Sequence, residues 1–210
     1  MSISTTHYPE NGDRLSRDDF ELLCDTWSIE NAELIHGVVR MNAAAVRFRE
    51  HGKPHSMIML WLGTYATHCS EVEVGDNTSI RFDDQNEPQP DAVMFRMNSG
   101  KCQVSADGYL EGTPELIVEI AASSVSYDVH EKLDLYEQQG IPEYIVWRTE
   151  DRAIDWFRLT DGRYRPLPPD DHDVVSSIVF PGLRLSPASM LNGDMKSVLN
   201  LLQNSRSSDE

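Results

Sequence analysis

The segment TPELIVEIAAS, from Thr113 to Ser123, does most to define the fold of this chain. Between Leu116 and Ala121 every side chain but one is apolar, so neither face of the predicted strand is polar. The exception is Glu119. A strand that is apolar on both faces lies inside a sheet that is covered on both sides. The segment therefore predicts a central strand with a carboxylate in the protein interior, and that charge needs a partner.

The residues after this strand predict a β-α-β unit. The segment SVSYDVHEKLDLYEQQG favours a helix, because Ser124 or Ser126 can cap its first turn and Gly140 can end its last turn. The next segment, PEYIVWR, is typical of another strand. A strand, a helix and a second strand between Leu116 and Trp147 fit one crossover unit of a mixed sheet.

The rest of the chain adds helices and strands in mixed order, which predicts an α/β fold. In chain order we expect a helix at 16–27, a hairpin at 31–42, irregular chain at 44–56, a helix at 54–69, a strand pair or bent strand at 71–84, a strand at 89–97, a polar loop at 98–113 and a hairpin at 155–167. One domain is expected to span residues 15–202, between a loose lead at 1–14 and a disordered tail at 203–210.

The composition is ordinary for a soluble globular protein, and we expect a cytoplasmic protein with no membrane partner. The longest apolar run, Met57 to Leu62, is far shorter than the ~20 residues that cross a bilayer. The N-terminus lacks a basic segment followed by an apolar one, so no secretory signal is expected. The three cysteines are widely spaced and form no CxxC pair, which suits a reducing compartment.

The charge of the chain is strongly acidic, with a formal net charge of −17 at pH 7. Such a field repels nucleic acid at long range unless basic groups or metal ions gather locally. Some basic residues do gather before the apolar helix, namely Arg40, Arg47, Arg49 and Lys53. They could line one wall of a DNA cleft, or they could belong to a solvated loop.

Three charged residues are candidates for a functional site. Asp91 follows a proline at the start of a strand, Glu119 lies within the buried strand, and Lys132 lies on the helix after it. Burial raises the pKa of a carboxyl group, which stays ionised only beside a cation or a set of donors. Two carboxylates that converge at strand ends form an oxygen site for Mg²⁺ or Mn²⁺, with Asp91 and Glu119 as the metal ligands. A nearby lysine can hold a water or stabilise negative charge, as phosphodiester hydrolysis requires.

Each of these residues also has a plainer interpretation. Asp91 could bond its own backbone in a turn, and Glu119 could be the buried partner of an arginine or a backbone amide. Lys132 could lie on the helix surface and pair with the aspartate four residues earlier. His51 and His55 have HxxxH spacing, but a nearby glycine and proline break a shared helical face, so we expect no zinc site there.

Four segments together carry a resemblance to a known family. They are AELIHG, QPDAVMF, the long run PELIVEIAASSVSYDVHEKLDLYEQQGIPEYIVW and SSIVFPGLRLSPASML. They resemble the Uma-two family of restriction-endonuclease-like proteins, a branch of the PD-(D/E)XK nuclease superfamily. The long run is the most specific part, and the resemblance extends from about Phe20 to Leu191. It implies a restriction-endonuclease-like core, in which helices flank a central mixed β-sheet, with extra hairpins towards both ends of the chain.

The resemblance also assigns the three candidate residues. Asp91 matches the aspartate of the superfamily's PD motif, and Glu119 matches the acid that precedes a lysine by two positions. Ala121 stands where that lysine is usual, so this chain departs from the superfamily pattern. In the Uma-two pattern the lysine comes instead from the following helix, and Lys132 matches that position.

The activity that the resemblance implies is Mg²⁺-dependent endonucleolytic hydrolysis of DNA. Lys132 would orient the attacking water. Glu33 and His55 match two further family positions; Glu33 would bind the metal through water, and His55 would contact the scissile phosphate or support the metal. The alternative is a catalytically weak or inactive nuclease-fold protein that acts as a binding or regulatory module, and hydrolysis of another phosphoester is a third possibility. A homodimer is common among such folds, and the apolar segment 190–202 could form its interface or pack on its own domain.

Overall fold

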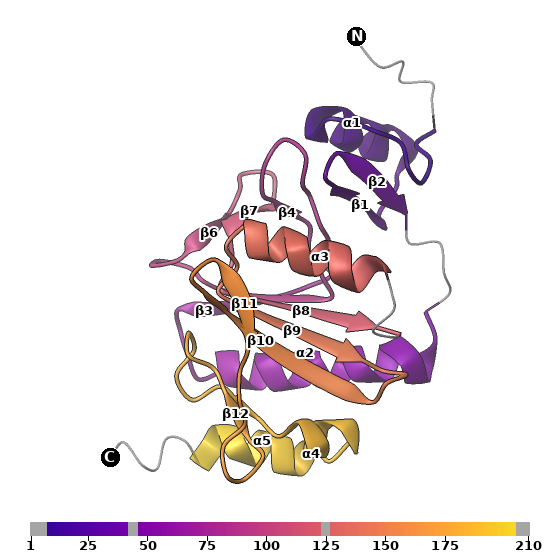
Figure 1. The fold of residues 1–210 in the computed structure, drawn as a ribbon. Coiled ribbons are helices and arrows are strands. Elements are labelled where there is room, and N and C mark those ends of the chain that lie inside the picture. Colours follow the sequence, from indigo (N-terminus) through magenta and orange to yellow (C-terminus); the bar gives the residue numbers. More distant parts are fainter. Residues whose placement is uncertain (1–7, 42–45, 123–126, 205–210) are drawn as a thin grey trace.

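The computed structural model describes residues 8–41, 46–122 and 127–204, and Figure 1 shows its fold. The helical segments are α1 (Arg17–Trp27), the π-helical turn η1 (Phe48–Gly52), α2 (Lys53–Ala66), α3 (Tyr127–Gln138), α4 (Pro187–Leu191) and α5 (Met195–Asn204). The strands are β1 (Ala32–Ile35), β2 (Val38–Met41), β3 (Val72–Asp76), β4 (Ile80–Arg81), β5 (Ala92–Arg96), β6 (Lys101–Val104), β7 (Leu110–Thr113), β8 (Leu116–Ala121), β9 (Glu143–Arg148), β10 (Ala153–Thr160), β11 (Arg163–Pro166), β12 (Val175–Ser176) and β13 (Arg184–Leu185).

A mixed sheet of six strands, in the order β11-β10-β9-β8-β5-β3, forms the centre of the fold. Strands β8 and β9 run parallel and are joined by α3, whereas the other neighbours in this sheet are antiparallel. Figure 1 shows α3 on one side of the sheet and α2 on the other, with α4 and α5 beyond α2. The predicted mixed α/β fold and its β-α-β unit are therefore confirmed.

The two faces of β8 belong to different apolar cores, as a strand buried on both sides requires. Leu116, Val118 and Ile120 pack into the core beneath α2. Ile117, on the opposite face, packs into the core beneath α3. Because side chains alternate along a strand, Glu119 lies on the same face as Ile117 and points towards α3.

The predicted N-terminal helix and hairpin both form. Ser16 caps α1 by accepting a hydrogen bond from the amide of Asp19. The hairpin turns at His36 and Gly37, which have φ angles of 53° and 72°, as a type I′ turn demands. The expected loose lead is wrong for the residues just before α1, because the Gly12 amide donates to the carbonyl of Val39 in β2.

Three further expectations about the chain need correction. The segment expected to be irregular at 44–56 is helical from Phe48 onward, because η1 continues directly into α2. The expected polar loop at 98–113 contains β6 and β7, which form a small sheet with β4. The expected strand pair at 71–84 is divided between two sheets, because β3 pairs with β5 while β4 pairs with β7.

The C-terminal part of the chain packs on its own domain. Strands β10 and β11 form the hairpin predicted at 155–167. Val198 and Leu202 of α5 are buried in the core beneath α2. Gln203 and Asn204, expected in the tail, belong to α5. Residues 205–210 and the predicted caps of α3, Ser124 and Ser126, lie outside the described residues. No helix in the described part of the chain has both the length and the apolar character needed to cross a membrane.

Candidate active site

Asp91 and Glu119 face each other across two antiparallel strands. Ala92 of β5 pairs with Val118 of β8. Because the strands are antiparallel, Asp91, just before Ala92, and Glu119, just after Val118, occupy opposed positions on the same face. Both side chains are buried. The amide of Ile120 donates to Asp91 Oδ2 at 2.6 Å, which fixes one oxygen of that carboxylate. The bonds that Asp91 forms thus connect it to the neighbouring strand and do not close a local turn.

The carboxylate of Glu119 is held by two side chains of α3. Lys132 Nζ lies 3.0 Å from Glu119 Oε1, and the hydroxyl of Tyr136 donates to the same oxygen at 2.6 Å. Residues four positions apart share one face of a helix, so α3 presents both groups to β8 together. The surface interpretation of Lys132 is wrong, because its side chain is only 12% exposed. Among the described residues the partners of Glu119 are therefore a lysine and a tyrosine, not an arginine.

Glu33 joins the same cluster from the N-terminal hairpin. Lys132 Nζ lies 2.8 Å from Glu33 Oε1, which also accepts a hydrogen bond from the amide of Gln89. The cross-strand neighbour of Glu33 is Arg40, whose guanidinium pairs with Glu131 of α3 at 2.8 Å. Two ion pairs between adjacent positions therefore attach the hairpin to α3. Arg40, considered above as part of a DNA-binding wall, is used in this attachment.

Two histidines, one from η1 and one from α2, contact Asp91. His51 Nε2 lies 2.8 Å from Asp91 Oδ1, and His55 Nε2 donates to the main-chain oxygen of Asp91 at 2.9 Å. His55 Nε2 also lies 3.1 Å from a carboxylate oxygen of Asp76. The expectation that these histidines share no helical face is wrong, because η1 runs into α2 and the two ring centroids are 5.5 Å apart. Their contacts support Asp91.

The electrostatics of the cluster are dominated by burial. Burial raises the pKa of Glu119 to about 8; the charge of Lys132 opposes this rise, while the charges of Asp91 and Glu33 add to it. Burial lowers the pKa of Lys132, but its two carboxylate partners raise that pKa by more than burial lowers it. The ammonium therefore stays charged. The hydrogen bond to Asp91 raises the pKa of His51. Two carboxyl groups thus contact one lysine, and a third, that of Asp91, lies opposite Glu119, so the cluster holds more carboxyl groups than ammonium groups.

The oxygen donors of the cluster match a hydrated divalent cation. No three His, Cys, Asp or Glu side chains among the described residues are arranged to enclose a metal ion by themselves. Magnesium does not require such a cage, because it keeps several waters and is bound through one or two carboxylates together with substrate phosphates. Asp91 and Glu119 supply two such carboxylates. With an ammonium beside them, the arrangement has the parts of a metal-assisted phosphoryl hydrolase.

Sequence reasoning missed His51 and Tyr136. Tyr136 had a usable signal, because it lies four positions after Lys132 on a predicted helix. His51 had a signal in its HxxxH spacing with His55, which was set aside because of Gly52 and Pro54.

The central mixed sheet with helices on both faces is the architecture of a nuclease-like fold. The chain belongs to the Uma2 family, described as “Putative restriction endonuclease”, which matches residues 17–188. Among solved structures, the chain is similar to a crystal structure from Anabaena variabilis described as “a putative nuclease belonging to DUF820”. That structure has 14% sequence identity and a TM-score of 0.65, and the alignment covers 85% of this chain and 98% of that one. No curated protein matches the chain.

Proposed function

We propose that this protein is a metal-dependent endonuclease that hydrolyses phosphodiester bonds in DNA. The observation that carries the proposal is the buried, opposed pair Asp91 and Glu119 with the ammonium of Lys132 3.0 Å from Glu119. Membership of the Uma2 family supports it, because that family is described by endonuclease activity. A buried pair of acids with only one nearby ammonium lowers the free energy of unfolding. A bound cation would offset that loss.

Asp91 and Glu119 would hold Mg²⁺ or Mn²⁺. Both provide the hard oxygen donors that these cations prefer, and the excess of carboxyl groups over ammonium groups favours a bound cation. When bound, the cation would supply Lewis acidity towards the phosphate and lower the pKa of a water. The histidines would keep Asp91 oriented, since His51 binds its side chain and His55 binds its main chain.

Lys132 would act on the attacking water and on the charge that develops on the phosphate. Its ammonium has three hydrogens, and the structure accounts for contacts to Glu33 and Glu119. The remaining hydrogen can bind a water or a phosphate oxygen. Glu33 would position Lys132, because its Oε1 contacts this ammonium and accepts a hydrogen bond from the Gln89 amide.

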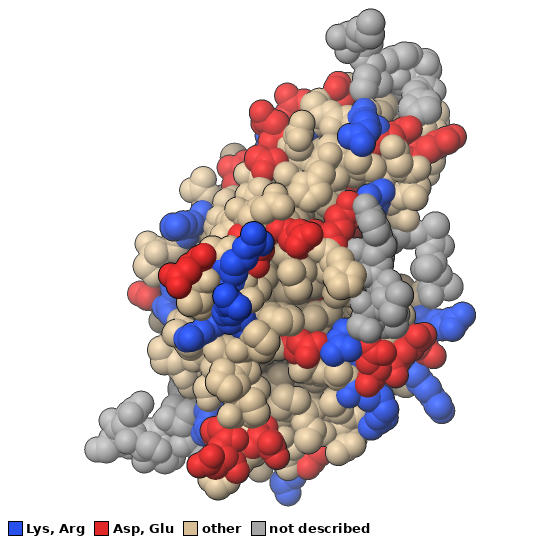
Figure 2. Space-filling model, viewed as in Figure 1, with Lys and Arg blue, Asp and Glu red and all other residues tan. Residues whose placement is uncertain are grey.

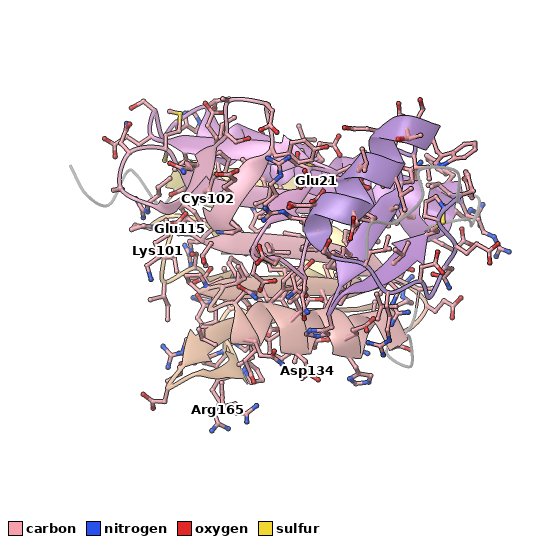
Figure 3. The ribbon with its side chains drawn as sticks, turned by 90° about the horizontal axis from the view of Figure 1, so that it is seen from above. Glu21, Lys101, Cys102, Glu115, Asp134 and Arg165 are labelled. Carbon is pink, nitrogen blue, oxygen red and sulfur yellow. The ribbon has the colours of Figure 1, made fainter. Side chains whose placement is uncertain are left out.

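The test is a calorimetric titration of Mn²⁺ into the wild-type protein and into Glu119→Ala, followed by cleavage of supercoiled plasmid. We expect saturable binding that Glu119→Ala removes. Asp134→Ala is the matched control. Asp134 is an acid of the same helix, α3, but it is exposed (Figure 3). Its affinity for Mn²⁺ should equal that of wild type.

Absence of Mn²⁺ binding in the wild-type protein would contradict the proposal. The fold would then serve as a binding or regulatory module, which Ala121 and the net charge of −17 would favour. Binding without plasmid cleavage would direct the search to other phosphoesters. A panel of phosphomonoesters and phosphodiesters would then identify the substrate.

A further inference from the structure

A groove of about 460 Å³ lies on the α2 side of the sheet, opposite the face on which Glu119 meets Lys132. Its floor is apolar and includes the buried side chains of Met57, Trp147 and Met190. Its rim carries the exposed cations Arg49, Lys53 and Arg152 together with Phe48. The floor and rim thus suit a ligand with a flat apolar part and an anionic part.

The cations of the rim are free to bind an anion. Within the described residues, Arg49, Lys53 and Arg152 form no ion pair, whereas nearby Arg148 pairs with two aspartates. Figure 2 shows Lys and Arg side chains, interspersed with acids, on the side of the molecule where α2 begins. Against a net charge of −17, unpaired cations around one groove form a local attractive site for phosphate groups.

The groove is linked to Asp91 by residues of η1 and of the central sheet. His51, which binds Asp91, lies two positions from Arg49 and two from Lys53. Trp147 on the groove floor pairs across β8 and β9 with Ile120, whose amide binds Asp91. The groove is therefore connected to Asp91 through His51 and through the Ile120 amide, from the α2 side of the sheet.

We propose that this groove binds an unpaired nucleotide of the nucleic acid strand beside the bond that is cleaved. The cations of the rim would hold its phosphates, while its base would lie on the apolar floor and against Phe48, whose side chain is 72% exposed. Positively charged grooves that carry aromatic side chains bind single strands in this way. Bases within a duplex are stacked and cannot enter such a groove. The inference rests on the proposed function for the identity of the ligand, and it names single-stranded or locally unpaired DNA as the substrate class.

The test is fluorescence anisotropy with a fluorescein-labelled single strand and with a duplex of the same sequence, both in EDTA so that nothing is cleaved. We expect the single strand to bind roughly tenfold more tightly than the duplex. Phe48→Ala should remove most of this difference, because it removes the stacking surface. Arg152→Ala should weaken binding of the single strand and lower the slope of log K against log salt concentration by about 0.7.

The matched control is Arg165→Ala. Arg165 is an exposed arginine of β11, and Figure 3 shows it pointing away from the body of the fold. This variant should bind the single strand as the wild type does. Phe48, Arg152 and Arg165 are all exposed, so thermal unfolding should be the same for the three variants.

Equal affinity for duplex and single strand, or wild-type binding by both groove variants, would overturn the inference. The failure of the proposed function would look different. If the wild type cleaves no DNA with Mn²⁺ but Phe48→Ala and Arg152→Ala still weaken binding, the groove inference stands and the nuclease proposal fails. If DNA is cleaved and both variants bind and cleave as wild type does, the nuclease proposal stands and the groove inference fails.

Discussion

Lys132 Nζ lies 3.0 Å from Glu119 Oε1, although the two residues come from different elements of the fold. The contact exists because α3 crosses the face of β8 that carries Glu119. Ala121 is on this face as well, since it lies two positions after Glu119 on the strand. A strand lysine at position 121 and a helix lysine at position 132 therefore approach the same carboxylate from the same side of the sheet.

Replacing Lys132 with alanine should abolish DNA cleavage while leaving Mn²⁺ binding. The change removes the group that we assign to the water and the developing charge, and such a loss lowers kcat by roughly 10²–10³-fold. The cation would still have both carboxylates, and loss of the repelling ammonium offsets the rise in the pKa of Glu119 that the change also causes. Plasmid cleavage and calorimetry on the same preparation measure the two effects, and an unchanged cleavage rate would remove Lys132 from the mechanism.

A second lysine placed on the strand should restore part of the lost cleavage. In the double variant Ala121→Lys with Lys132→Ala, the ammonium again lies on the Glu119 face of the sheet. We expect recovery of about tenfold over Lys132→Ala alone, because the new ammonium reaches the site but lacks the support of Glu33. A double variant no faster than Lys132→Ala would show that the helix position is required.

Replacing Tyr136 with phenylalanine should weaken Mn²⁺ binding in a pH-dependent way. The hydroxyl of Tyr136 bonds the Glu119 carboxylate, and this bond lowers a pKa that burial has raised to about 8. Without it, the proton leaves Glu119 less readily, and the cation must displace that proton. We expect affinity at pH 7 to fall roughly tenfold, with a smaller deficit at higher pH where Glu119 is ionised anyway.

The control for this variant is Tyr144→Phe. The Tyr144 ring lies 5.3 Å from the Tyr136 ring and is equally buried, but its hydroxyl has no hydrogen-bond partner among the described residues. Its removal should leave Mn²⁺ affinity unchanged at every pH. Titrations between about pH 6.5 and pH 8.5 compare the two variants. A deficit for Tyr136→Phe that is constant with pH would contradict the assigned role.

The sequence predicted the centre of this fold because strong local signals agreed there. The apolar run around Glu119 requires a strand that is covered on both sides. Gly140 ends α3 as expected, with a φ of 75° and a hydrogen bond from the Ile141 amide back to the Tyr136 carbonyl. The place of Lys132 beside Glu119 came from family resemblance, since a lysine on a helix carries no signal of burial by itself.

Other elements were not predicted, because the role of a glycine or proline in them depends on contacts with distant parts of the chain. Pro54 lies in the first turn of α2, as expected, because its missing amide hydrogen costs nothing there. The sequence did not predict that η1 precedes Pro54 and continues into this helix. Gly112 lies within β7 at a φ of 92°, too close to the Lys101 carbonyl for any side chain. In the sequence it appeared to be a loop residue, whereas in the fold it allows β6 and β7 to pair closely.

Replacing Glu143 with alanine should destabilise the fold without affecting the metal. This fully buried carboxylate accepts hydrogen bonds from the Trp156 indole, the Ser177 hydroxyl and the amides of Ile178 and Val179. Alanine would leave these donors unsatisfied, at a cost of roughly 3–5 kcal/mol in the free energy of unfolding. Urea unfolding measures the cost, and a loss below about 1 kcal/mol would mean that water replaces the carboxylate.

Replacing Glu87 with glutamine should change how stability depends on pH. Glu87 is 4% exposed, and burial, with a hydrogen bond to Glu21, raises its pKa from the ordinary 4.5 to about 8. Below pH 4.5 the group is protonated in both the folded and the unfolded chain and contributes no pH dependence. Between pH 4.5 and about 8 only the folded chain keeps the proton, so this group lowers stability by up to about 1.4 kcal/mol per pH unit as pH rises.

Glutamine resembles the protonated carboxyl group and cannot ionise, so the variant should lose this part of the pH dependence. We expect its unfolding free energy to match wild type near pH 4.5 and to exceed it progressively up to pH 8, as urea titrations at several pH values would show. Glu111→Gln is the control, because Glu111 contacts the same Arg81 from a position that is 41% exposed and should leave the wild-type slope intact. Parallel curves for wild type and Glu87→Gln would mean that Arg81, which pairs with Glu21 at 2.8 Å, keeps Glu87 ionised in the folded protein.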